Sequence, residues 1–232
     1  MRILAVETST LMGSVAVVDN NRVLCELTLH VEETHSSQLM PAIDYVLKTV
    51  GLTPPLLDGF AVALGPGSFT GLRIGLSTVK GLAVAASKPV AGIPTLEAMA
   101  WSFPFCPYLM CPLIDARMKE VYGAWFRAKA GKPVRESEDM VLPISHLLKG
   151  MKEKVLFFGS GAQRYREEIT GIMGELAHFA SPEIMGARAS IVGFLGGEKM
   201  SRRDLADVHS LEPLYIRESQ AIAKLRDPAS KR

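Results

Sequence analysis

The chain has 232 residues, of which 48% are hydrophobic and 22% charged, the balance of a globular protein long enough for one large or two smaller cores. Its formal net charge of +2 is too small to predict a nucleic-acid-binding surface. No apolar run reaches the roughly 18 residues of a membrane span, and the N-terminus lacks a signal-peptide pattern, so we expect a cytoplasmic protein with no membrane partner.

The first half of the chain alternates between short apolar runs and helical patterns. The expected elements, in chain order, are strands at 2–6, 13–18 and 23–29, a helix at 36–50, a strand at 60–64, a helix at 70–87, a strand at 89–93 and a helix from 94 to about 102. The first three strands, with turn residues at 19–21, predict an antiparallel meander. A meander followed by strand–helix–strand units predicts a mixed α/β sheet with helices on its faces, the pattern of a ribonuclease-H-like domain.

A second region begins after the segment 103–107, where aromatic and proline residues interrupt the periodicity. We therefore expect an N-terminal, partner-binding domain at 1–104 and a smaller C-terminal α/β domain at 105–232, whose last helices pack back on the first. The expected elements of the second domain are strands at 108–115, 120–127 and 133–141, a short helix at 145–149, a strand at 155–158, and helices at 163–169 and 185–200.

The segment 64–87 is the most distinctive part of the chain. A Gly-Pro-Gly turn at 65–67 follows a buried strand, and Ser68 and Thr70 are candidate N-caps of an almost uncharged helix. One side of this helix is apolar and consists of Leu72, Leu76, Val79, Ala83 and Ala86. The adjacent side carries mostly small residues, and together the two sides cover about twice the roughly 100° stripe of an ordinary surface helix.

Two interpretations of the small-residue side remain open: the helix is sandwiched inside its own protein, or this side docks a helix of another chain. In the second interpretation the helix at 36–50 widens the patch, and self-pairing is expected when the partner is missing. A leucine in place of Gly75 is then expected to abolish pairing and leave a folded monomer. The candidate partner-binding residues are Ile43, Val46, Leu47, Val50, Gly71, Arg73, Ile74, Gly75, Thr78, Leu82 and Ala85.

Arg73 is one of only two charged residues on this helix. It lies in the first turn and a half, where a cation meets the positive end of the helix dipole. We therefore expect a carboxylate or carbonyl, from a neighbouring loop or from a partner, to compensate its charge.

Four motifs spread over essentially the whole chain carry a family resemblance. They are Val6-Glu7-Thr8-Ser9, His35-Ser36 with Leu39 and Pro41, the segment 65–75 with sequence GPGSFTGLRIG, and Pro213-Leu214-Tyr215-Ile216-Arg217. Together they resemble the TsaB (YeaZ) family. The resemblance implies an actin-like (ASKHA, ribonuclease-H-like) fold of two domains.

The same resemblance implies a non-catalytic scaffold subunit required for threonylcarbamoyl transfer to adenosine 37 of tRNAs that read codons beginning with A. The implied partners are TsaD, the catalytic paralogue, and the ATPase TsaE. A heterodimer with TsaD is implied, with a homodimer in its absence, and contact with tRNA would come through the complex.

Two turns at strand ends expose backbone N–H groups, which are able to hold an anion. Neither is a P-loop, and a glycine at a turn also has a purely geometric explanation. The alternative functions are therefore an ATP-dependent phosphotransferase of the sugar- or acetate-kinase type and a structural homodimer without a tRNA role. The candidate contacts of a vestigial nucleotide site are Thr8, Ser9, Gly65, Gly67, Gly159 and Gly161.

No metal site, cofactor or catalytic residue is expected. By the resemblance, residues 93–100 correspond to a histidine-containing stretch of TsaD-type sequences, but no histidine occurs there. The chain's three cysteines also lack metal-ligand spacing and are expected to be reduced. Asp115, Arg117 and Glu120 form a charged group at a strand end that is able to serve acid–base chemistry, but we expect Asp115 and Arg117 to pair with each other.

Overall fold

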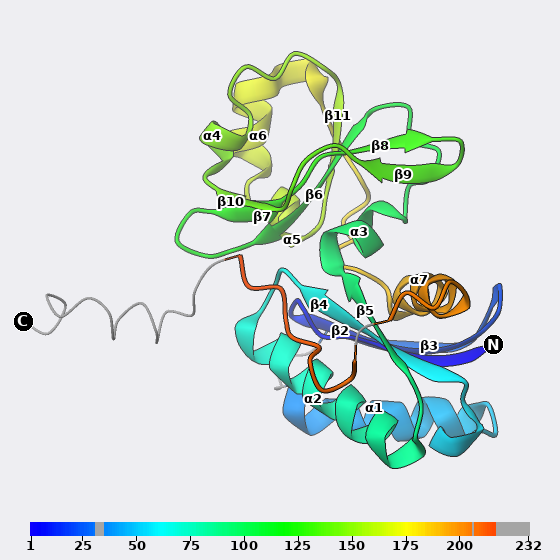
Figure 1. Ribbon diagram of the computed structural model, residues 1–232. Coiled ribbons are helices and arrows are strands. Elements are labelled where there is room, and N and C mark those ends of the chain that lie inside the picture. Colours follow the sequence, from blue (N-terminus) through cyan, green and yellow to red (C-terminus); the bar gives the residue numbers. More distant parts are fainter. Residues whose placement is uncertain (31–34, 206, 217–232) are drawn as a thin grey trace, which may run out of the picture.

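The computed structural model describes residues 1–30, 35–205 and 207–216 and contains two sheets, one above the other in Figure 1. The first sheet has the strand order β3-β2-β1-β4-β5. Strands β1, β2 and β3 are antiparallel, whereas β1, β4 and β5 are parallel. The elements of this half are β1 (Arg2–Glu7), β2 (Met12–Asp19), β3 (Arg22–His30), α1 (His35–Thr49), η1 (Pro54–Leu56), β4 (Gly59–Gly65), α2 (Phe69–Ala86), β5 (Val90–Pro94) and α3 (Thr95–Ala100).

The second sheet has seven strands, in the order β10-β7-β6-β11-β12 with the β8–β9 hairpin attached to β6. The elements of the second half of the chain are β6 (Leu109–Asp115), β7 (Val121–Gly123), β8 (Phe126–Lys129), β9 (Lys132–Arg135), β10 (Met140–Leu142), α4 (Ile144–Leu147), β11 (Val155–Phe158), α5 (Ser160–Arg164), α6 (Arg166–Met173), η2 (Gly174–Leu176), β12 (Ala177–Phe179) and α7 (Ala189–Ser201).

The two sheets repeat one topology. If β8 and β9 are set aside as an inserted hairpin, each half runs as an antiparallel meander of three strands, a helix, a parallel strand, a helical segment and a second parallel strand. The repeat is completed by a helix after each half, α3 and α7. The sequence order predicts this arrangement only loosely, because the second half divides its strands and helices differently.

Three predicted elements of the second half were wrong in detail. The expected strand at 120–127 is divided into β7 and β8, because β7 pairs with the end of β6 and with β10, whereas β8 pairs with β9 and meets β6 only at Met110. The expected strand at 133–141 is likewise divided into β9 and β10, and the helix at 163–169 into α5 and α6. Strand β12 has only three residues, too few for the alternation that identifies a strand in sequence.

Helices cover both faces of the first sheet. Residues Leu4 and Val6 of β1 point into the core beneath α1 and α2, and the alternate residues Ile3 and Ala5 point to the other face. That other face packs against α7, which follows the second sheet in the chain (Figure 1). The chain therefore crosses from the first half to the second and returns to the first.

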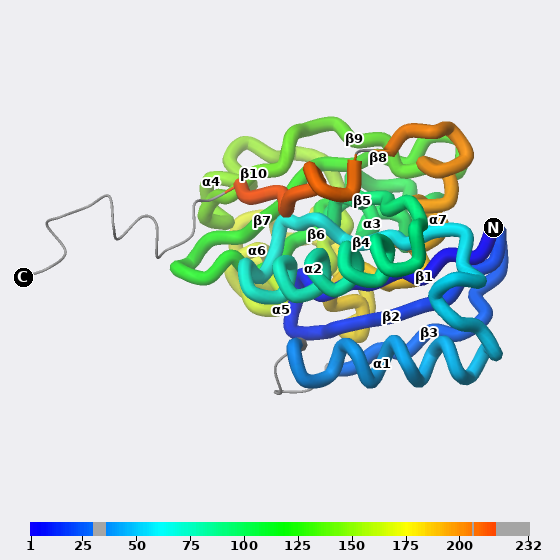
Figure 2. Tube along the Cα trace, turned by 60° about the horizontal axis from the view of Figure 1, so that its bottom comes forward, coloured from blue at the N-terminus to red at the C-terminus, as the bar shows by residue number. Residues whose placement is uncertain are grey.

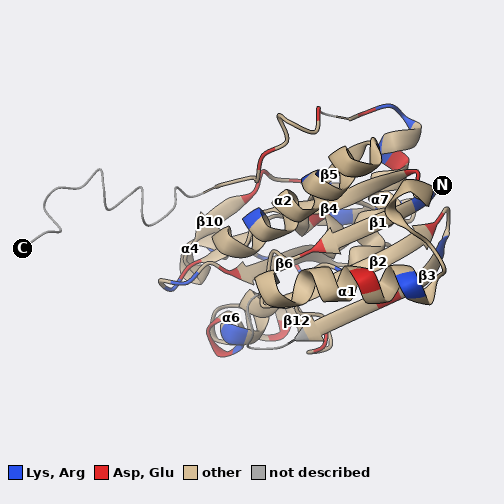
Figure 3. Cartoon of the chain, turned by 90° about the horizontal axis from the view of Figure 1, so that it is seen from below, with Lys and Arg blue, Asp and Glu red and all other residues tan. Residues whose placement is uncertain are grey.

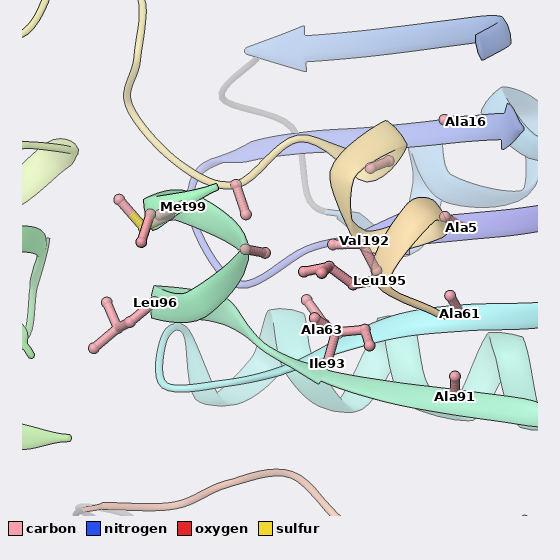
Figure 4. Packing of buried hydrophobic residues seen from close by; sticks show 14 of the residues in the cluster. Ala5, Ala16, Ala61, Ala63, Ala91, Ile93, Leu96, Met99, Val192 and Leu195 are labelled. Carbon is pink, nitrogen blue, oxygen red and sulfur yellow. The ribbon is translucent and has the colours of Figure 1, made fainter. Parts of the chain in front are cut away.

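Alanine residues on the strands allow α7 to approach the first sheet closely. Figure 4 shows Ala5, Ala16, Ala61 and Ala91 facing this helix. A Cβ atom added to Gly196 of α7 would lie 2.6 Å from the Cβ of Ala61. Small residues on both surfaces thus fix the position of the returning helix.

After α7 comes the segment 207–216, which we call the C-terminal strap; it begins with a turn at 208–210 and continues without helix or strand. Figure 2 shows the strap, in orange and red, running alongside α2. It is anchored by the buried Leu211, 7% exposed, and by a hydrogen bond of 2.7 Å from the Leu214 N–H to the Leu64 carbonyl. None of the helices described is long and apolar enough to span a membrane.

Candidate functional site

Helix α2 begins as the sequence predicts, since the Ser68 hydroxyl accepts a hydrogen bond from the Gly71 N–H (3.2 Å) and caps the helix. Ser87, in the left-handed region with φ of 53°, forms its C-cap. Most of the predicted apolar side is also confirmed: Leu72, Leu76, Val79 and Ala83 are buried, the last three in the core of the first sheet, and Ala86 is half-buried beside them.

The glycines of the small-residue side pack inside the protein. The Thr8 hydroxyl donates a hydrogen bond of 2.8 Å to the Gly71 carbonyl, and a Cβ atom added to Gly75 would lie 2.2 Å from the Thr8 hydroxyl oxygen. Both glycines are buried. The expectation that Gly71 and Gly75 form a docking surface was therefore wrong, because they allow the turn after β1 to lie against α2.

The apolar residues predicted for α1 are also largely internal. Ile43, Val46 and Leu47 are at most 6% exposed and belong to the core beneath the first sheet, and Val50 is half-buried beside them. The prediction that Ile43, Val46 and Leu47 contact a partner was wrong, since the apolar stripe of a helix on a sheet is its inward side.

A different set of residues covers the side of α1 and α2 that points away from the sheet. Tyr45 is 59%, Val84 52% and Met40 48% exposed. Ala85 is exposed, and Ile74, Thr78 and Leu82 are partly so. Figure 3 shows that these two helices carry few charges. We call this set the outer face: Met40, Tyr45, Ile74, Thr78, Leu82, Val84 and Ala85.

Arg73 lies at the border between the outer face and the strap. Its Nε donates a hydrogen bond of 2.8 Å to the Tyr215 hydroxyl, and its guanidinium carbon lies 3.9 Å from the centre of the Phe69 ring. Among the described residues, the groups beside its charge are a phenol oxygen and an aromatic ring, and the expected carboxylate or carbonyl does not come from a neighbouring loop. Lys80, the other charge of α2, donates to the His209 carbonyl (3.0 Å). The polar stripe of α2 thus holds the strap.

A cleft of about 800 Å³ opens between the two halves. Its walls combine hydroxyl groups, two arginines and apolar side chains, and the strap contributes residues 214–216. The polar residues that line it include Ser9, Ser68, Asp115, Arg117, Ser160 and Arg164.

The proposed vestigial nucleotide contacts are mostly engaged with the chain itself. The Gly65 N–H donates to the Thr95 hydroxyl (3.1 Å), and the Gly159 N–H donates to the Ile184 carbonyl (3.0 Å). A Cβ atom on Gly67 would lie 2.2 Å from the Ser9 carbonyl oxygen, and one on Gly161 would lie 3.0 Å from the Leu113 backbone.

The Thr8 hydroxyl is committed to α2, as described above, and of the six candidates Ser9 and Gly67 line the cleft. The glycines thus serve close packing of backbone on backbone. This close packing gives no support to a phosphate cradle at these glycines or to the phosphotransferase alternative.

Glu7 is a buried acid that belongs to one of the family motifs but was not among the predicted site residues. It is completely buried at the end of β1. Its Oε1 accepts two hydrogen bonds, one from the Ser9 N–H (2.6 Å) and one from the Ser9 hydroxyl. Its other oxygen, Oε2, has no partner among the described residues. Burial raises the pKa of Glu7 to about 7. The polar Glu-Thr-Ser sequence directly after an apolar strand was the available signal.

The charged group at the end of β6 is arranged differently from the expectation. The Asp115 carboxylate accepts hydrogen bonds from the Arg117 backbone N–H and from the Arg164 guanidinium, both at 3.0 Å. Asp115 is therefore paired with the Arg164 side chain, not with that of Arg117. Within the described residues no group of three or more His, Cys, Asp or Glu side chains is placed to hold a metal.

Known proteins resemble this chain over nearly all of its length. The family model described as TsaD, tRNA N6-adenosine threonylcarbamoyltransferase, matches residues 29–224. The tRNA threonylcarbamoyladenosine biosynthesis protein TsaB of Bacillus subtilis is 32% identical, over 97% of each chain. The chain belongs to the TsaB (YeaZ) family. The Escherichia coli protein of the same description is 30% identical, over 97% of this chain and 98% of that one.

Solved structures place the TsaB family member described here in the actin-like (ASKHA) fold. YeaZ from Pseudomonas aeruginosa has a TM-score of 0.78 at 26% identity, covering 93% of this chain and 99% of that one. The activator of the 2-hydroxyisocaproyl-CoA dehydratase from Clostridium difficile has a TM-score of 0.53 at 10% identity, covering 89% of this chain and 99% of that one. The second likeness concerns the fold alone.

Proposed function

We propose that this chain acts in tRNA threonylcarbamoyladenosine biosynthesis as a non-catalytic scaffold that binds and supports a TsaD-type subunit. The observation that carries the proposal is the outer face, where Met40, Tyr45 and Val84 are about half exposed on two helices with few charges. Exposed apolar surface of this kind is typical of protein–protein interfaces. The shared family model makes a TsaD-type paralogue the natural partner.

The proposal includes a TsaE-type ATPase as a further member of the complex, tRNA contact through the complex, and a cytoplasmic location. A homodimer through the outer face is proposed for the isolated chain, since an isologous contact covers the same apolar residues.

The experiment compares two outer-face variants with a matched control. Tyr45→Glu and Val84→Glu each place a charge on the outer face, and Ile172→Glu places one on a residue of α6 that is similarly exposed (46%). We expect the first two variants to weaken binding to the TsaD-type subunit of the same organism at least tenfold in calorimetric titration. In a mixture reconstituted with TsaD- and TsaE-type proteins, they should also lower tRNA modification, whereas the control behaves as wild type.

Unchanged binding by both outer-face variants would show that the interface lies elsewhere. Magnesium-dependent ATP hydrolysis by the isolated chain would instead support the phosphotransferase alternative.

A further inference from the structure

Arg73 has donor groups left over after its contacts with the described residues. A guanidinium carries five N–H donors in a planar fork, and within the described residues only Nε has a hydrogen-bond acceptor, the Tyr215 hydroxyl. The side chain makes no ion pair with a described carboxylate. Arg73 is exposed, and among the described residues neither Nη1 nor Nη2 has a hydrogen-bond acceptor.

The aromatic contacts hold this guanidinium in one orientation. The Phe69 ring lies 3.9 Å from its central carbon, and the Tyr215 ring lies 5.7 Å away. The two rings contact each other with centroids 4.9 Å apart. A cation held against the Phe69 ring and hydrogen-bonded to the Tyr215 hydroxyl has lost much of its conformational freedom before any partner arrives, which lowers the entropic cost of binding.

We propose that Arg73 is the charged anchor of the outer face and that it fits an acidic side chain of the TsaD-type partner, an inference that rests on the proposed function. The carboxylate pairs in a bidentate manner with Nη1 and Nη2, while Nε keeps its bond to Tyr215. Charge complementarity favours an acid, because α2 presents no carboxylate of its own.

The same contact links partner binding to the strap. Tyr215 and Phe69 both line the cleft, as do the strap residues Leu214 and Ile216. A carboxylate that fixes Arg73 also fixes Tyr215, and hydrogen bonds in such a chain strengthen one another. Partner binding therefore stabilises the strap in place and, through it, one wall of the cleft.

The test measures binding and strap protection separately. Wild type, Arg73→Ala, Arg73→Lys and Tyr215→Phe are titrated with the TsaD-type subunit, and hydrogen exchange of residues 207–216 is followed with and without it. Lys80→Ala is the matched control, because Lys80 also holds the strap but lies outside the proposed anchor.

We expect Arg73→Ala to bind about tenfold or more weakly and to lose the salt dependence of the wild-type affinity. The affinity of Arg73→Lys should lie between those of wild type and Arg73→Ala, since an ammonium keeps the charge and loses the planar fork. Partner binding should slow exchange in the strap of wild type and of Lys80→Ala but not in that of Arg73→Ala. Tyr215→Phe should retain most of the affinity and lose the added protection.

Three results would overturn the inference. They are equal binding by wild type and Arg73→Ala, unchanged strap exchange on binding by wild type, and equal effects of Lys80→Ala and Arg73→Ala on affinity. In each of these cases the wild type still binds, so the proposed function stands. Absence of binding by the wild type itself would overturn both the inference about Arg73 and the proposed function. Wild-type binding only to a second copy of this chain would overturn the TsaD-type partner and assign the Arg73 anchor to the homodimer.

Discussion

The Thr8 hydroxyl oxygen occupies the space that the side chain of any residue other than glycine would need at position 75. The separation between that oxygen and a Cβ atom added to Gly75 would be 2.2 Å. The same hydroxyl donates to the Gly71 carbonyl, so it has little freedom to move. This contact fixes α2 against the turn after β1, at the edge of the cleft.

Gly75→Ala is therefore expected to lower the free energy of unfolding by about 1–3 kcal/mol, through overpacking and loss of the Thr8 hydrogen bond. Gly81, on the same helix but exposed with no atom within 4 Å of an added Cβ, supplies the control. Gly81→Ala should raise stability by roughly 0.5–1 kcal/mol, the ordinary helix preference. Urea denaturation of the two variants measures the contrast.

The double variant Thr8→Ala/Gly75→Ala sharpens this test. Because Thr8→Ala removes the clashing hydroxyl, the double variant should be less destabilised than the sum of the single changes. Strict additivity would contradict the proposed contact. The Gly75→Leu variant expected from the sequence to be a folded monomer should instead fold poorly, since leucine is larger still.

Glu7 should make stability depend on pH in the direction opposite to an ordinary salt-bridged acid. Burial raises its pKa from 4.5 to about 7, so the folded state binds the proton more tightly than the unfolded state. The contribution of Glu7 protonation to the free energy of unfolding is complete below pH 4.5 and is lost as pH rises to about 7. The change amounts to roughly 3 kcal/mol.

Glu7→Gln should flatten the stability profile between these pH values, as measured by thermal unfolding at a series of pH values. Glu175→Gln, at an exposed position, is the control and should keep the wild-type slope. An unaltered slope in Glu7→Gln would show that another group titrates in this range.

The pair formed by Asp115 and Arg164 should be energetically asymmetric. Asp115 also accepts a hydrogen bond from the Arg117 backbone N–H, and its side chain is 19% exposed compared with 63% for Arg164. Asp115→Ala is expected to lower the free energy of unfolding by about 1–2 kcal/mol, and Arg164→Ala by less than about 0.5 kcal/mol. Equal losses in chemical denaturation would mean that the ion pair, not the backbone contact, dominates.

The isolated chain is expected to bind no stoichiometric zinc or iron, because no histidine occurs in residues 93–100. Elemental analysis after mild purification measures this directly, with the TsaD-type subunit purified in parallel as a comparison. One metal ion per chain in the isolated protein would contradict the prediction.

The sequence by itself determined the main strands and helices of the first half, two candidate caps of α2, of which the structure uses Ser68, and the inward side of α2. These features depend on neighbours within about four residues, where turn propensity and helical periodicity act directly. The motifs around Glu7 and at 65–75 likewise led to the TsaB family without knowledge of any contact.

Only the tertiary structure decided how each surface of α2 is used. A helical wheel places Gly75 beside Gly71, but it does not show that Thr8, 67 positions earlier in the chain, packs against both. The partner of Arg73 lies 142 residues away, and the helix that covers the far face of the first sheet comes from residues 189–201. Such contacts depend on how separate elements come together in space, and periodicity within one element carries no information about the neighbour that it will meet.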